Sequence, residues 1–302
     1  MSGSERISGF VIAYNRAELL ATCLRSLRFV DELIVIDKSS TDDTPRIARR
    51  YADRVIRVPW SPTVEETRSL ALEECRHDRV AFLDDDEMLS AQAIEYLHAA
   101  RDAGGPDAVA LPRRHWILGT FDADAYHWPE HQIRFFRKGA VTFAPVVHGG
   151  IDVRTDRIER VPHESAIFIE HLSHADTEQW IERTNRYTSC SRRVSAAPDT
   201  ADMIDFAHER IDHWLALSRH SDRSDYPAAV ALLRAIYDMV DHVKAWEARQ
   251  GRDGTAAFRT RCDELDRAYD ELEIRCGIAT GMRTSRPATG GVLQRLTGRN
   301  RC

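Results

Sequence analysis

Residues 80–89 read VAFLDDDEML, a stretch in which an apolar run meets four acidic residues at Asp84–Glu87. The apolar half is short and continuous, which is typical of a buried strand. Carboxylates held this close raise each other's pKa unless a cation neutralises them. The simplest alternative is a solvated turn after the strand. The position of the acidic run within the predicted sheet favours a functional site instead.

The chain ahead of this stretch alternates short apolar runs with helical patterns. Strands are predicted at 8–14, 31–40 and 54–60, and helices at 17–27, 41–52 and 64–75. Strands that alternate with helices through short loops form right-handed crossovers, and the resulting parallel sheet is covered on both faces. The sequence therefore predicts an α/β fold with a mostly parallel, Rossmann-like sheet.

Three polar clusters follow predicted strands: Tyr14–Asn15, Asp37–Lys38 and Asp84–Asp86. In such sheets, ligands bind beyond the carboxyl ends of the strands. The spacing Asp84-x-Asp86 favours a hard divalent ion such as Mg²⁺ or Mn²⁺, which takes oxygen ligands and often retains phosphates. Such a spacing is a weak motif alone, but its place after a fourth strand predicts a metal that carries a diphosphate.

The rest of the chain changes character twice. Residues 105–175 contain strand-like segments, and residues 176–279 contain four predicted helices at about 176–194, 202–218, 227–251 and 255–276. The spacing of Asp176 and Gln179 is that of a capping box. Residues 280–302 are basic and are expected to be disordered. The predicted domains are 1–175 for the sheet, 176–279 for a C-terminal helical region, and 280–302 for the tail.

Composition narrows the function classes. The chain has 302 residues, 43% hydrophobic and 30% charged, with a formal net charge of −6. A nucleic-acid partner is not expected, because such binding domains are usually basic. The six cysteines form no CxxC pair, which argues against a zinc site and a disulfide framework. No signal peptide and no membrane span are predicted, so we expect a cytoplasmic protein.

Several motifs in order resemble one known family. ISGFVIAYNRAELLATCLRSL, ELIVIDKSSTDDT and RVAFLDDDE are similar to the start of the family 2 glycosyltransferases. LPRRHWILGT, HWPEHQIRFFRKG, VVHGGI and IEHLSHADTEQWIERTNRYT resemble the branch that contains the lipopolysaccharide-core β-glucosyltransferases. The resemblance covers about 7–190 and implies the GT-A fold of nucleotide-diphospho-sugar transferases, an inverting mechanism and a nucleotide-sugar donor.

The resemblance also implies site residues. Asp84 and Asp86 match the metal and ribose motif, with Asp86 the better direct ligand. Arg134 matches a recurring arginine whose role could equally be structural. The full set implied to bind the nucleotide sugar is Ala13, Tyr14, Asn15, Asp37, Lys38, Arg68, Asp84, Asp85 and Arg134.

Two positions depart from the family pattern. Lys38 stands where an acid often contacts the base, and a charged lysine accepts no hydrogen bond. Gly149 stands where the branch has a glutamate that could deprotonate the acceptor. His148 and Asp152 are the candidate replacements as catalytic base. An acceptor that ionises readily is the other explanation.

The predicted function is metal-dependent, inverting transfer of a hexosyl group, with Mn²⁺ or Mg²⁺ as cofactor. A UDP-sugar is the first choice of donor, with GDP- and dTDP-sugars as alternatives. The acceptor could be a glycan, a lipid, a peptide or a natural product, and the C-terminal helices could bind a lipid-linked acceptor at a membrane surface or simply pack on the sheet. The rival functions are a nucleotide-sugar-binding protein without activity and a nucleotidyltransferase. The latter usually has a Gly-rich loop after the first strand, which AYNRAELL lacks.

Overall fold

The structure is a computed structural model, and it describes residues 5–62, 64–101, 104–143, 151–190, 203–218, 224–251 and 253–277. Contacts between Cα atoms divide the chain into two compact units, 1–246 and 247–302. Each unit is described by itself. The functional cavity lies in the first unit.

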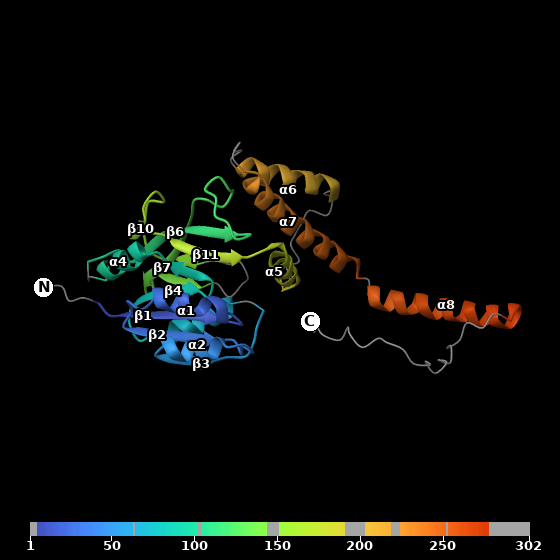
Figure 1. The fold of residues 1–302 in the computed structure, drawn as a ribbon, viewed down its shortest axis with the longest axis horizontal. Coiled ribbons are helices and arrows are strands. Elements are labelled where there is room, and N and C mark those ends of the chain that lie inside the picture. The colour runs from blue at the N-terminus through green and yellow to red at the C-terminus, as the bar shows by residue number, and fades with distance from the viewer. Residues whose placement is uncertain are drawn as a thin grey trace, which may run out of the picture. The chain divides into compact units, whose positions relative to one another are not determined.

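The first hundred residues form the predicted alternation (Figure 1). The elements are β1 (Ile7–Ala13), α1 (Ala17–Ser26), β2 (Glu32–Asp37), α2 (Thr44–Tyr51), β3 (Arg54–Arg57), α3 (Glu65–Glu74) and β4 (Arg79–Asp84). Their strands are parallel and follow the order β3-β2-β1-β4. The predicted α/β class with a parallel sheet in this part of the chain is confirmed.

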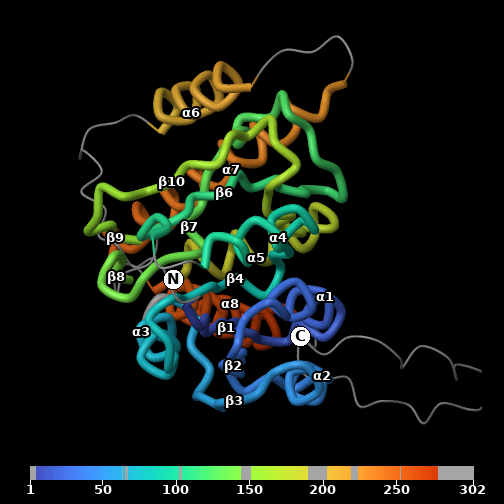
Figure 2. The backbone as a smooth tube through the Cα atoms, turned by 90° about the vertical axis from the view of Figure 1, so that its left-hand side faces the viewer, coloured from blue at the N-terminus to red at the C-terminus, as the bar shows by residue number. Residues whose placement is uncertain are grey.

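The apolar side chains on the two faces of these strands pack against different helices. One face packs with α1 and α2, through residues such as Leu20, Leu24 and Ala48. The other face packs with α3 through Ala71 and Cys75. Figure 2 shows α3 on the opposite side of the strands from α1 and α2. Because both faces are covered, the strands read as continuous apolar runs rather than as alternating ones.

The strand order reverses next to β1. The chain moves outward from β1 to β2 and β3, and then returns to place β4 on the other side of β1. Ala13 at the end of β1 is level with Asp37 of β2, and Ile12 is level with Asp84 of β4. This reversal is the point at which open α/β sheets bind their ligands.

The sheet continues with strands of mixed direction. Nine described strands form it, and beyond β4 the order is β7-β6-β11-β5, with β10 paired to β6. These elements are β5 (Glu87–Leu89), β6 (Ala108–Ile117), β7 (Glu130–Arg137), β10 (Ile158–Arg160) and β11 (Ile169–His174), and helix α4 (Ala91–Ala99) follows β5. A separate ribbon pairs β8 (Val141–Phe143) with β9 (Ile151–Val153). The strands expected within 105–175 are therefore present.

Four helices follow in the described part of the chain: α5 (Thr177–Cys190), α6 (Met203–Leu217), α7 (Tyr226–Gln250) and α8 (Gly254–Cys276). The predicted cap at Asp176 is present, because its Oδ1 accepts from the backbone N–H of Gln179 at 2.8 Å. The Gln179 side chain accepts from Ala175 N–H, one residue earlier than in a regular capping box. Gly277 ends α8 with φ +64°, the left-handed conformation typical of a helix end.

Helix α6 and most of α7 belong to the first unit. The Tyr226 hydroxyl at the start of α7 donates to the carbonyls of Ile117 and Thr120, and Trp214 of α6 donates to Asp238 of α7 at 2.7 Å. The second unit begins within the last turn of α7 and contains α8. The boundaries at 175 and 279 remain predictions, and the tail at 280–302 lies outside the described residues. Among the described helices, none is both long and apolar enough to cross a bilayer.

Candidate active site

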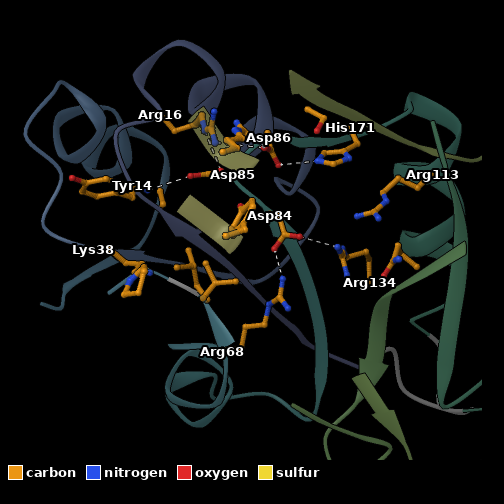
Figure 3. A pocket seen from close by; sticks show the side chains of 18 of the residues that line it. Tyr14, Arg16, Lys38, Arg68, Asp84, Asp85, Asp86, Arg113, Arg134 and His171 are labelled. Carbon is orange, nitrogen blue, oxygen red and sulfur yellow. Dashed lines mark hydrogen bonds and ion pairs between the residues drawn. The ribbon is translucent and has the colours of Figure 1, made fainter. Parts of the chain in front are cut away.

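A cavity of about 730 Å³ opens where β1 and β4 end (Figure 3). Predicted site residues that line it are Ala13, Tyr14, Lys38, Arg68, Asp84, Asp85, Asp86 and Arg134. Asn15 lines a second cavity of about 700 Å³, which shares Tyr14, Arg16 and Arg183 with the first. Asp37 is not among the described residues that line either cavity. The structure thus brings together most of the residues predicted to bind the nucleotide sugar.

The acidic run is a tight turn between two strands. Val80 to Leu83 are buried in β4, and Asp85 and Asp86 form the turn into β5. The backbone N–H of Asp84 donates to Glu87 at 3.2 Å and closes the turn. This turn points the four carboxylates in different directions, so cations from several elements can reach them.

Asp84 lies between two arginines. Arg68 of α3 donates to its Oδ1 at 2.7 Å, and Arg134 of β7 donates to its Oδ2 at 2.9 Å. Both contacts are drawn in Figure 3. The Asp84 side chain is 30% exposed, so it is the carboxylate of this turn that faces open space most.

Glu87 is fully buried and accepts hydrogen bonds from two arginines. Arg134 donates to both of its oxygens, at 2.6 and 2.8 Å, and Arg113 of β6 donates at 2.9 Å. Burial alone would raise the pKa of Glu87, but Arg134 and Arg113 outweigh it and lower the pKa below the ordinary value. Glu87 therefore stays charged and holds Arg134 within hydrogen-bond distance of Asp84.

Asp85 binds the loop after β1. Its carboxylate accepts from the Tyr14 backbone N–H and from the Arg16 side chain, both at 3.2 Å. Burial, together with the neighbouring carboxylate of Asp86, raises the pKa of Asp85 to about 6, against the opposing pull of Arg16. Its position indicates that Asp85 holds the Tyr14–Arg16 loop in place.

Asp86 is buried among cations. Its Oδ1 lies 3.4 Å from His171 Nε2, and its Oδ2 lies 3.1 Å from Arg183 and 3.5 Å from Arg16. Burial would raise the pKa of Asp86, but His171, Arg16 and Arg183 lower it well below the ordinary value. Asp86 therefore remains ionised at neutral pH.

The cations expected around the acidic run are thus largely arginines. Arg68 and Arg134 were predicted at the site, whereas Arg113, Arg183 and His171 were not placed beside the acids. A signal existed for Arg113: it is a charged residue within the strand-like run ALPRRHWI, where alternate side chains share a face. No comparable signal marks Arg183, which lies on α5.

The residues present fit a divalent cation at one point. No group of three His, Cys, Asp or Glu side chains that could hold a metal occurs among the described residues. Asp86 Oδ1 and His171 Nε2, however, are an oxygen and a nitrogen that face each other at 3.4 Å. Two ligands at right angles, each about 2.1 Å from one Mg²⁺, would lie about 3 Å apart. The pair therefore suits a cation that takes its other ligands from phosphate and water.

An aromatic pair lines the end of the cavity away from His171. Tyr14 and Trp60 have ring centroids 6.1 Å apart, and Trp60 is 50% exposed. Trp60 was not predicted as a site residue, although it follows the third predicted strand. Lys38 also lines this part of the cavity and donates from Nζ to the Ser61 carbonyl at 2.5 Å.

The other predicted residues near this end have local roles. Asp37 is buried and its Oδ1 accepts from the Ser40 backbone N–H at 3.0 Å. Asn15 has φ 47°, and its side chain accepts from Thr41 N–H at 2.8 Å, which ties the loops after β1 and β2 together. Contact of Asp37 and Asn15 with a nucleoside stays a prediction.

The two candidate bases differ in what the structure says about them. His148 and Gly149 lie outside the described residues. Asp152 of β9 is 67% exposed and pairs weakly with Arg154 at 3.7 Å. Its neighbour Ile151 lines the cavity, and successive strand residues point to opposite faces, so Asp152 points away from the cavity.

Comparisons with known proteins show which family this chain resembles. The family model described as glycosyl transferase family 2 matches residues 8–154. The uncharacterized glycosyltransferase RP128 of Rickettsia prowazekii is 36% identical over 61% of this chain and 66% of its own length. The lipopolysaccharide core biosynthesis glycosyltransferase LpsC of Rhizobium meliloti is 27% identical over 48% of this chain and 56% of its own. The chain spans 36 to 66% of the length of the first Rickettsia relatives.

Among solved structures, residues 1–349 of S. aureus TarS align with 82% of this chain and 93% of that one, at 16% identity and a TM-score of 0.40. Glucosyl-3-phosphoglycerate synthase from Mycobacterium tuberculosis aligns with 37% of this chain and 44% of its own, at 26% identity and a TM-score of 0.31. The strand order and the family match confirm the GT-A fold that the sequence predicts. Residues 8–154 of this chain therefore form a domain of glycosyl transferase family 2.

Proposed function

We propose that this chain transfers a hexosyl group from a nucleoside diphosphate sugar to an acceptor, with inversion at the anomeric carbon and with Mn²⁺ or Mg²⁺. The observation that carries the proposal is the cavity at the sheet's reversal point, with aromatic rings at one end and the Asp86–His171 pair at the other. A UDP-sugar is the first choice of donor, before GDP- and dTDP-sugars. The cytoplasm is the proposed location.

The nucleoside would bind at the aromatic end. The half-exposed Trp60 ring, beside Tyr14, offers an apolar face for a base. Lys38 and Asp37 lie at the neighbouring strand end. Asp37 would bind the nucleoside through its second carboxylate oxygen, because its first accepts from Ser40. Tyr14 is placed by Asp85, which accepts from its backbone N–H.

The diphosphate would bind toward Asp86. A divalent cation held by Asp86 and His171 would supply positive charge to the leaving diphosphate. Arg183 and Arg186 of α5 line the same cavity. Arg186 forms no ion pair with a carboxylate among the described residues, so its charge is available to a phosphate. These donors favour the charge that develops as the sugar leaves.

The second cavity would bind the acceptor, because it joins the first at Arg16, Arg183 and His174. The acceptor hydroxyl needs a base as it attacks the anomeric carbon. His148 is the better candidate, since Asp152 points away from the cavity. The C-terminal helices would shape the acceptor side of the site. The acceptor itself could be a glycan, a lipid, a peptide or a natural product.

The test is a donor screen with UDP-, GDP- and dTDP-sugars in the presence of Mn²⁺, with release of the nucleoside diphosphate as the readout. We expect slow hydrolysis of one donor, loss of turnover in EDTA, and loss of turnover in Asp86→Ala with an unchanged circular dichroism spectrum. Asp43→Ala is the matched control, because Asp43 is an exposed acid that pairs only with its own helix neighbour Arg46 in the described structure. Full activity in EDTA would overturn the metal requirement.

The same screen separates the rival function. Tight donor binding without any turnover would identify a nucleotide-sugar-binding protein, which Gly149 in place of an acid keeps open. If turnover is found with an acceptor, proton NMR of the product reports the configuration of the new bond. A retained configuration would overturn inversion.

A further inference from the structure

A chain of hydrogen-bonded side chains connects Asp86, beside the cavity, with Glu130 in the second half of the sheet. Asp86 Oδ1 faces His171 Nε2 at 3.4 Å, and His171 Nδ1 lies 2.9 Å from Nδ1 of His115. His115 Nε2 lies 2.5 Å from Glu130 Oε2. His171 and His115 are direct partners in the β11–β6 pair, which explains why their rings meet.

The far end of this chain is a carboxylate. Arg113 donates to Glu130 Oε2 through two nitrogens, at 2.8 and 3.2 Å, which holds Glu130 in its charged form. An ionised carboxylate only accepts hydrogen bonds, so the hydrogen between Glu130 and His115 sits on His115 Nε2.

The remaining tautomers follow from that hydrogen. A neutral imidazole carries one hydrogen, so neutral His115 has a bare Nδ1 that can only accept. The contact to His171 then requires a hydrogen on His171 Nδ1. The other ring nitrogen of His171, Nε2, then faces the carboxylate of Asp86. Between this nitrogen and the carboxylate lies either a hydrogen on Nε2 or a divalent cation that replaces it.

We propose that Glu130 and His115 are positioning residues: through the hydrogen bonds Glu130–His115–His171 they fix the tautomer of His171, so that its Nε2 lone pair and Asp86 together bind a divalent cation. The inference rests on the proposed function and names two residues that act through His171. His115 is buried and Glu130 opens β7, so both are held by the sheet rather than by a loop. Removing such an outer partner typically weakens metal binding about 10–100-fold.

The first measurement is the tautomer itself. Long-range ¹H–¹⁵N NMR of histidine-labelled protein, in mildly alkaline buffer without metal, distinguishes a protonated from a bare ring nitrogen. We expect hydrogen on Nδ1 of His171, assigned with His171→Gln. In Glu130→Gln the new amide can also donate to His115, so the form of His171 with a bare Nδ1 should gain population. A bare His171 Nδ1 in the wild-type protein would overturn the inference.

The second measurement is Mn²⁺ binding alone, followed by electron paramagnetic resonance with no nucleotide present. Glu130→Gln and His115→Phe should bind Mn²⁺ roughly 10–100-fold more weakly than wild type. His115→Gln should restore most of the affinity, because an amide can donate to Glu130 and accept from His171. Wild-type affinity in both weakened variants, or no Mn²⁺ binding by the wild-type protein, would overturn the inference.

His127→Phe is the matched control. The His127 ring packs 4.8 Å from that of His115, but neither of its nitrogens has a hydrogen-bond partner in the described structure. Mn²⁺ binding should be unchanged in this variant, and an equal loss would assign the effect to ring packing. The proposed function fails separately, if the tautomer and Mn²⁺ affinity are as stated but no nucleotide sugar is turned over.

Discussion

The ends of β2 and β4 carry similar acids but satisfy them in different ways. Asp37 at the end of β2 accepts from Ser40, three residues away, and Lys38 donates to the Ser61 carbonyl. At the end of β4, Glu87 depends on Arg113 and Arg134, which lie 26 and 47 residues away.

The difference has a physical reason. A single acid at a strand end can be satisfied by the next turn of backbone, whereas four adjacent carboxylates repel one another and need several cations around them. Those cations must come from other elements, because the N–H groups of the turn itself carry only partial positive charges. The end of β4 is therefore both the most charged and the most interlocked part of this sheet edge.

The largest effect is expected from breaking this network at its buried centre. Glu87→Gln keeps the shape of the side chain but leaves Arg113 and Arg134 without its charge. Leaving one partner of a buried ion pair uncompensated costs about 3–5 kcal/mol in unfolding free energy. Urea denaturation at neutral pH measures the loss. Asp43→Asn, at an exposed pair, should leave the midpoint unchanged, and an equally small effect of Glu87→Gln would mean that the network adds no stability.

The same variant should respond to pH in a defined direction. Because the folded-state pKa of Glu87 lies below its ordinary value of 4.5, its stabilising contribution is present above pH 4.5. That contribution is lost as the pH falls toward the folded-state pKa. The stability gap between wild type and Glu87→Gln should therefore narrow as unfolding is measured at successively lower pH below 4.5. A gap that widens on acidification would contradict the assigned charge.

A smaller effect is expected at the end of β2. If Asp37 holds the nucleoside, Asp37→Ala should weaken donor binding by roughly 1.5–3 kcal/mol, the value of a charged hydrogen bond. Calorimetry with UDP measures the affinity, and denaturation measures the cost of losing the Ser40 contact. Lower stability with unchanged affinity would restrict Asp37 to holding the turn and place the nucleoside elsewhere.

The smallest effect concerns the aromatic end. Trp60→Ala should weaken UDP binding by roughly 0.5–1.5 kcal/mol, typical of one aromatic contact, and Trp60→Phe should recover part of it. Because Trp60 is half exposed, the fold should tolerate both changes. Equal UDP affinity in all three proteins would remove Trp60 from the nucleoside site.

Much of the first half of the molecule was predictable from the sequence. The predicted strands at 8–14 and 31–40 correspond to β1 and β2, and the predicted helix at 17–27 corresponds to α1. Local periodicity and end signals suffice there, because each element is buried by its immediate neighbours. The predicted helix ends at Gly251 and Gly277 rest on a similarly local rule, and both glycines have positive φ.

The partners of the acids were less predictable. Arg183 lies 97 residues from Asp86, and His171 reaches Asp86 only because β11 pairs with β6 and β5. Period and composition carry no information about such pairings. Trp60 was not predicted as a site residue for a similar reason, because its place in the site depends on the ring of Tyr14 beside it.

The sequence by itself determined that β4 ends in more negative charge than its own turn can compensate, because adjacent carboxylates repel one another wherever the chain goes. It also determined the strand–helix alternation that places this charge at the edge of a parallel sheet. Only the tertiary structure decided which side chains pair with these acids: Arg68 and Arg134 with Asp84, Arg113 and Arg134 with Glu87, and His171 and Arg183 with Asp86. The reason is that Coulomb attraction depends on separation in space, and that separation is set by how strands pair and helices pack, not by distance along the chain.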